Sequence, residues 1–134
     1  MISSFINVLA KVLLSLLMVA PILGVTGIFP PPTPDMYNTP EAYAFIAQLM
    51  NASYIMIILS GVFAVALVCL WTKRVALAAL LILPLTVNIF AFHAFLDGGV
   101  FTAGAIMSNL IAVLNIYFLW QQRAVYQTLL IPRA

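Results

Sequence analysis

Four long apolar runs occupy most of this chain, and they restrict its fold more than any other feature. Three runs are uninterrupted, at about residues 54–70, 75–96 and 101–120, and the first, 8–29, contains Lys11 and Pro21. A helix needs about 20 residues to cross about 30 Å of hydrocarbon, and each run can supply them. Because backbone groups in lipid must pair within their own segment, these runs predict helices rather than a barrel.

The composition excludes a soluble globular domain. The chain is 66% hydrophobic and 6% charged, whereas soluble domains carry about 25% charged residues. We therefore predict an all-α fold, an integral membrane four-helix bundle that forms one membrane domain over residues 1–134. The expected spans are about 8–29, 53–71, 75–96 and 101–120, with an outer proline-rich loop at 30–40.

The charged side chains sort by sign along the chain. The basic residues fall at the N-terminus, in the second loop and in the C-terminal tail (Lys11, Lys73, Arg74, Arg123, Arg133), and the acidic residues fall in the first and third loops (Asp35, Glu41, Asp97). With four spans, the two groups lie on opposite sides of the membrane. The positive-inside rule then predicts that both termini are cytoplasmic, in a multi-pass protein of a cell membrane such as the bacterial inner membrane.

The segment that precedes the second apolar run predicts a helix start. Thr39 is a good N-cap, Pro40 suits the first helical position, and Glu41 suits the positive end of the helix dipole. From Thr39 to Trp71 the chain is longer than one membrane crossing requires. We therefore expect a break near Asn51 and Ser53, before the second span begins.

The third apolar run carries polar groups that are costly in hydrocarbon. They include Asn88, the only histidine, His93, and Asp97 at the end of the run. One interpretation is structural: His93 in the last turn favours the helix C-terminus and bonds Asp97, four residues on, before Gly98 and Gly99 end the helix.

The alternative interpretation of this run is a binding site. Asn88 and His93 would offer hydrogen bonds to a ligand among aromatic side chains (Phe90, Phe92, Phe95, Phe101), and such a pocket suits a quinone or another lipid-soluble molecule. The candidate ligand-binding residues are Thr86, Asn88, Phe92, His93 and Asp97.

Other chemistry is poorly supported by the sequence. One histidine and one aspartate are too few ligands for zinc, so we predict no metal site. No Ser/His/Asp or Cys/His arrangement is present, so we predict no catalytic residues, and an enzyme would need a bound cofactor. The single cysteine, Cys69, excludes an internal disulfide. A net charge of +2 without a basic cluster predicts no nucleic-acid partner.

Several segments resemble the DoxX-like family of small four-helix membrane proteins. They are Gly24–Phe29 with the prolines that follow, Pro40–Phe45 with Ser53 and Tyr54, Leu83–Pro84, Val87–Ile89, Phe92–Asp97 and Val113–Trp120. The resemblance implies a four-helix fold and an association with quinone-linked oxidoreductases. The chain departs from the family at Ile57–Ser60, where many relatives carry an acidic residue. That departure argues against proton or cation coupling.

Two functions follow as hypotheses. The first is a non-catalytic subunit or partner of a larger membrane assembly, such as a quinone-linked redox assembly, with other membrane subunits or a second copy of the chain as partners in the lipid bilayer. The second is a small transporter or binding protein for a lipophilic molecule or an ion. A quinone is the only cofactor that either hypothesis suggests.

Overall fold

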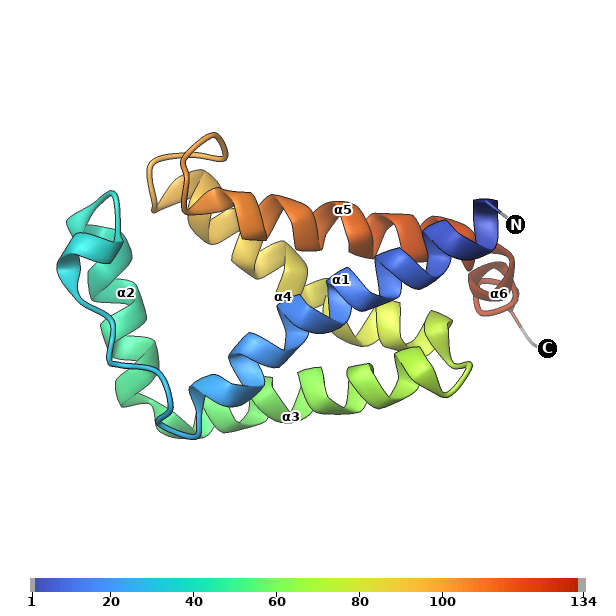
Figure 1. Cartoon of the computed structure of the whole chain (residues 1–134), viewed down its shortest axis with the longest axis horizontal. Helices are drawn as coiled ribbons and strands as arrows, with labels where there is room; N and C mark the ends of the chain where they lie inside the picture. Colours follow the sequence, from blue (N-terminus) through green and yellow to red (C-terminus); the bar gives the residue numbers. More distant parts are fainter. Residues whose placement is uncertain (1, 133–134) are drawn as a thin grey trace.

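The computed structural model describes residues 2–132, and within them every regular element is a helix (Figure 1). The all-α prediction is therefore confirmed. In chain order the elements are α1 (Ile2–Gly24), the short 3₁₀ helix η1 (Pro34–Met36), α2 (Pro40–Asn51), α3 (Ser53–Trp71), α4 (Val75–Phe95), α5 (Ala105–Gln121) and α6 (Arg123–Gln127).

Three helices are long and apolar enough to cross a membrane: α1 from Ser3, α3 and α4. The fourth apolar helix, α5, has 17 residues. Helix α1 ends at Gly24, so residues 25–29 of the expected first span lie outside it. Similarly, residues 101–104 belong to the loop before α5. Glycines with positive φ follow both α1 and α4, at Gly27, Gly98 and Gly99, and such backbone ends a helix.

The helices converge at one end of the molecule and separate at the other. Helix α3 packs against α1 and α4, and α4 packs against α5. Near the N-terminus α1 also meets α5, where the Asn7 side-chain oxygen accepts hydrogen bonds from Tyr117 (2.8 Å) and Gln121 (2.7 Å). Away from this contact α1 and α5 diverge, and α2 stands across the open end (Figure 1).

The buried core lies where the four long helices are in contact. Its largest members come from all four helices (Leu14, Met18, Phe63, Leu70, Ile82, Ile111, Leu114, Phe118), and alanines fill the closest approaches (Ala66, Ala78, Ala79). Lipid tails are as apolar as these side chains, so close packing and interhelical hydrogen bonds stabilise such a bundle, rather than exclusion from water.

Polar side chains tie neighbouring helices together inside the apolar core. Ser60 of α3 donates to the carbonyl of Pro21 (2.9 Å), which lies in the last turn of α1. Asn115 of α5 donates to the carbonyl of Ala79 on α4 (3.0 Å). These contacts fix how far each helix slides along its neighbour.

The predicted helix start at Thr39 is confirmed. The Thr39 hydroxyl accepts from the backbone N–H of Ala42 (3.1 Å), Pro40 is the first helical residue, and Glu41 lies in the first turn. The expected break is also present, because Ala52 (φ −82°, ψ 60°) separates α2 from α3. Helix α2 therefore changes direction relative to α3 and does not extend it.

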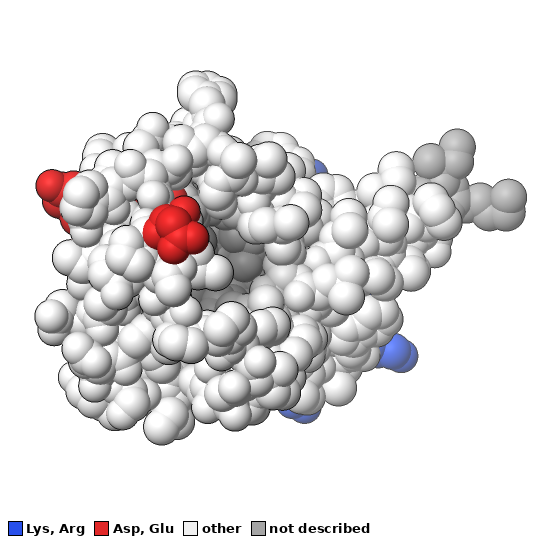
Figure 2. All heavy atoms as spheres, turned by 60° about the vertical axis from the view of Figure 1, so that its left-hand side comes forward, with Lys and Arg blue, Asp and Glu red and all other residues white. Residues whose placement is uncertain are grey.

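Acidic and basic side chains lie toward opposite ends of the described chain. Figure 2 shows acidic side chains on the end of the molecule where α2 stands, beside a hollow, with lysine and arginine side chains at the opposite margin. Arg133, one of the predicted basic residues, falls outside the described residues. The basic and acidic segments that alternate along the sequence therefore lie toward opposite ends of the described chain.

Candidate functional site

The site begins with a hydrogen-bonded pair at the end of α4. The Nδ1 atom of His93 lies 2.9 Å from Oδ2 of Asp97, one helical turn further along. Asp97 is 1% exposed, so its carboxylate is removed from solvent and depends on its hydrogen-bond partners. This pair is the one expected from the structural interpretation of the sequence.

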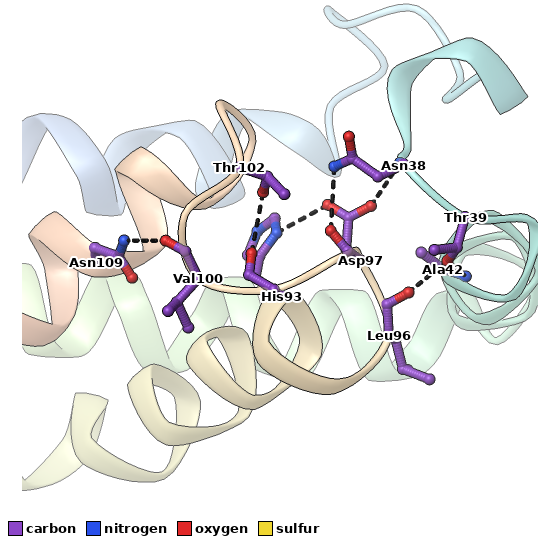
Figure 3. Close-up of polar contacts among 10 residues, drawn as sticks. Asn38, Thr39, Ala42, His93, Leu96, Asp97, Val100, Thr102 and Asn109 are labelled. Carbon is purple, nitrogen blue, oxygen red and sulfur yellow. Dashed lines mark hydrogen bonds and ion pairs between the residues drawn. The ribbon is translucent and has the colours of Figure 1, made fainter.

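Asp97 also holds the segment that leads into α2. Its Oδ1 accepts from the backbone N–H of Asn38 (2.7 Å), and its backbone carbonyl accepts from the Asn38 side-chain amide (3.1 Å). The Thr39 hydroxyl donates to the carbonyl of Leu96. We call these four residues, Asn38, Thr39, Leu96 and Asp97, the clasp; Figure 3 shows them joined at the end of α4.

Glycine at the start of α5 lets the backbone approach this pair closely. A Cβ atom at Gly104 would lie 3.4 Å from Asp97 Oδ2 and 3.7 Å from His93 Cε1. Gly98 has φ +81°, and a Cβ there would lie 3.1 Å from the Asn38 Cβ. The loop after α4 therefore closes tightly over the carboxylate and helps to exclude water from it.

One cavity, the α2 cavity, lies between α2, α3 and α4. Its volume is about 400 Å³, and Tyr37, Asn88 and His93 are the polar side chains in its otherwise apolar lining (Phe45, Ile46, Leu49, Ile55, Leu59, Phe63, Leu85, Ile89, Phe92). Phe92 packs edge-on against Tyr37 and His93 and lies 5.8 Å, between ring centroids, from Phe45 of α2. Helix α2 thus supplies one wall of an aromatic cavity.

A second cavity, the α1–α5 cavity, lies where α1 and α5 diverge. It has a volume of about 550 Å³, and only His93 and Ser108 are polar in its lining (with Leu13, Leu16, Leu17, Ala20, Pro21, Ile89, Met107, Leu110, Ile111). The Ser108 hydroxyl is buried and has no hydrogen-bond partner among the described residues. His93 and Ile89 line both cavities, so this turn of α4 forms the boundary between them.

The structure brings together three of the five predicted site residues. Asn88, Phe92 and His93 line the α2 cavity. Asp97 lines neither cavity; it orients His93 and anchors Asn38. Thr86 is buried, its hydroxyl has no partner in the part of the chain that the structure describes, and it also lines neither cavity.

The structure does not bring together the four phenylalanines that the binding-site interpretation placed around a ligand. Phe95 and Phe101 are 86% and 100% exposed, and Phe90 is also exposed. Helical periodicity turns Phe90 and Phe95 to the outside of the bundle, and Phe101 lies in the loop before α5. Of the four, Phe92 lines the α2 cavity, and the other aromatic walls come from α3 and the α2 region (Tyr37, Phe45, Phe63).

Sequence reasoning missed the contributions of other segments to this site. Ser108 belongs to a stripe of small residues on α5, which is typical of close helix packing. Only the three-dimensional arrangement shows that Ser108 also lines a cavity. Asn38 and Tyr37 lie in an irregular loop, where the sequence carries no periodic signal that relates them to α4. The buried position of Tyr37 raises the pKa of its phenol, with a further contribution from the charge of Asp97.

Comparisons with known proteins identify no relative. No protein-family model matches the chain, and neither the curated proteins nor the solved structures include a significant match. The likeness to the DoxX-like family therefore stays a prediction that depends on the segments given above.

Proposed function

We propose that this chain is an integral membrane protein that binds a lipid-soluble small molecule in the cavities that meet at His93. The observation that carries the proposal is a fixed histidine at the junction of two apolar cavities. Its Nδ1 is held by Asp97, and its side chain retains 15% exposure, so Nε2 is available to a ligand. An imidazole oriented in this way can bond a molecule that enters either cavity.

The cavities suit such a ligand in size and lining. Pockets for small molecules have volumes of roughly 300–1,000 Å³, mostly apolar walls and a few polar groups that fix the orientation of the ligand. Here the polar groups are Asn88 and His93 on α4, Ser108 on α5, and Tyr37 in the loop before α2. Their position near the open end of the bundle allows entry of a molecule from the surrounding lipid.

A quinone, which the DoxX-like resemblance implies, matches this chemistry in part. The flat ring can pack against Phe92 and Phe45, which line the same cavity, and the Asn88 amide can donate to a ring oxygen. The chain contributes no second redox group, and so we propose binding rather than catalysis. The remaining features of the proposal follow the sequence: four spans, with both termini in the cytoplasm of a bacterial cell.

Binding to the purified protein in lipid nanodiscs tests this function. We would measure two probes, 4-heptylphenol and heptyl phenyl ketone, by equilibrium dialysis against empty nanodiscs of the same lipid. The cavity-filling variant Ile89→Trp blocks both cavities, because Ile89 lines both. Val87→Trp is the matched control, since Val87 is 58% exposed on the outside of the same helix.

The proposal predicts that at least one probe binds above the empty-disc level. It also predicts that Ile89→Trp weakens this binding at least tenfold while Val87→Trp leaves it unchanged. If neither probe exceeds the empty-disc level, or if both variants behave like the wild type, the cavities are not a ligand site.

The second candidate function is that of a non-catalytic subunit of a larger membrane assembly. It is supported by the outer face of α3, where Gly61 is exposed and a Cβ there would contact nothing within 4 Å. Small residues on an outer face permit close approach of another membrane helix. Crosslinking from Gly61→Cys in native membranes, in a Cys69→Ala background, tests it, and absence of any crosslinked species would contradict it.

A further inference from the structure

We infer that the ligand presents a hydroxyl or another hydrogen-bond donor to Nε2 of His93, and that acceptor-only ligands bind less well. This inference rests on the proposed function and specifies the class of molecule. It makes the preferred ligand an apolar phenol or alcohol, such as a reduced quinol, rather than a ketone or an oxidised quinone.

The first step concerns the proton on the imidazole. An ionised carboxylate only accepts hydrogen bonds, and Asp97 uses Oδ1 for the Asn38 N–H and Oδ2 for His93. In a neutral imidazole one nitrogen carries the proton and the other a lone pair. The bond to Asp97 therefore places the proton on Nδ1 and leaves Nε2 as an acceptor.

The second step concerns what Nε2 meets. His93 lines both cavities, and its side chain retains 15% exposure. Most of the groups around it are apolar. In these surroundings a hydrogen-bond donor on the ligand stabilises the Nε2 acceptor. A carbonyl oxygen on the ligand would instead place its own lone pair against that of Nε2. Because the His93 side chain is largely buried, a ligand that leaves this acceptor unpaired binds less well, and we expect a preference of about tenfold for the donor.

The third step concerns Ser108, on the opposite side of the α1–α5 cavity from α1. Its hydroxyl is 2% exposed and unpartnered within the described chain. A hydroxyl group can both donate and accept. A ligand hydroxyl that donates to His93 can also accept from Ser108 once the Ser108 hydroxyl turns toward the cavity that both residues line.

The chain has only one histidine, which makes the tautomer directly measurable. We would record ¹⁵N spectra of the histidine-labelled protein in nanodiscs at pH 8, above the ordinary pKa range of histidine. We expect a protonated Nδ1 and an unprotonated Nε2, and 4-heptylphenol should shift the Nε2 signal far more than heptyl phenyl ketone does. A protonated Nε2 in the free protein at pH 8 would overturn the inference.

The variant Asp97→Asn provides a reversal test. Its amide oxygen can still accept from Asn38, while its NH₂ group donates to Nδ1 of His93 and moves the ring proton to Nε2. The wild type should bind the phenol about tenfold more tightly than the ketone, and Asp97→Asn should reduce or reverse that ratio. Equal affinity of the wild type for both probes would overturn the inference while the proposed function stands. Binding of neither probe would contradict the proposed function itself.

Discussion

Replacement of Asp97 by alanine should release the α2 segment from the end of α4. The change removes the carboxylate that accepts from the Asn38 N–H at 2.7 Å and from His93 at 2.9 Å. Two clasp bonds remain, from the Asn38 side chain to the backbone of residue 97 and from Thr39 to Leu96. We therefore expect the segment to open more often without separating completely.

The magnitude follows from the one lost bond that joins the end of α4 to the α2 segment, the bond from the Asn38 N–H, because His93 belongs to α4 itself. A hydrogen bond to a charged group contributes about 1.5–3 kcal/mol, so its loss weakens the closed state by that amount. Every 1.4 kcal/mol is a factor of ten, which makes the ratio of open to closed molecules roughly 10- to 100-fold larger.

The distance between a spin label on α2 and one in the α4–α5 loop, measured by electron paramagnetic resonance, reports this opening. Labels at Ala44→Cys and Phe101→Cys, both exposed positions, with Cys69→Ala to remove the native thiol, report the separation in nanodiscs. Asp97→Ala should add a population at longer distance. Asp35→Ala is the control, since Asp35 is exposed and bonds only within its own turn. An unchanged distance distribution in Asp97→Ala would refute the argument that the carboxylate holds α2.

Two further substitutions test the packing and the ionisation described above. Asn115→Leu should raise the free energy of unfolding in SDS by about 1 kcal/mol. The bond to Ala79 that it removes is worth only about 0.6 kcal/mol in a membrane bundle, whereas the side-chain oxygen that it also removes is buried without a partner among the described residues. A clear loss of stability would contradict this expectation. Burial raises the pKa of the Tyr37 phenol in the folded protein above its value in the unfolded chain. The neutral phenol therefore adds its full contribution to the unfolding free energy below about pH 10, and this contribution is lost as the pH rises through the raised pKa. Tyr37→Phe should therefore reduce the decline in unfolding free energy between pH 9 and 11, and an unaltered decline would show that Tyr37 is not responsible.

The helices were predictable because each depends on a local property of the sequence. The run 53–71 coincides with α3, and the Thr39–Pro40–Glu41 start coincides with α2, because capping and apolar length act over a few residues. The ends of α1 and α5 differ from the expected spans, because apolar residues continue beyond glycines that turn the chain. Hydropathy does not register such a turn.

The site was less predictable, because it depends on contacts between distant segments. The His93–Asp97 pair could be expected, since residues four apart share a face of a helix. The bond from Asn38 to Asp97 joins residues 59 positions apart, and no periodicity relates them. Which phenylalanines face inward also depends on where α2 lies, and the sequence contains no local signal for its direction after Ala52.

A single carboxylate connects the two parts of the site. Oδ1 of Asp97 holds the segment before α2, and Oδ2 holds the ring that faces the cavities. A donor on Nε2 favours the same tautomer that Asp97 requires, because a hydrogen-bonded chain strengthens each of its members. By linkage, if the closed clasp favours the ligand-accepting form of His93, a bound ligand must favour the closed clasp by the same free energy. The proposed ligand site therefore predicts that ligand affinity and the position of α2 are coupled through the His93–Asp97 pair.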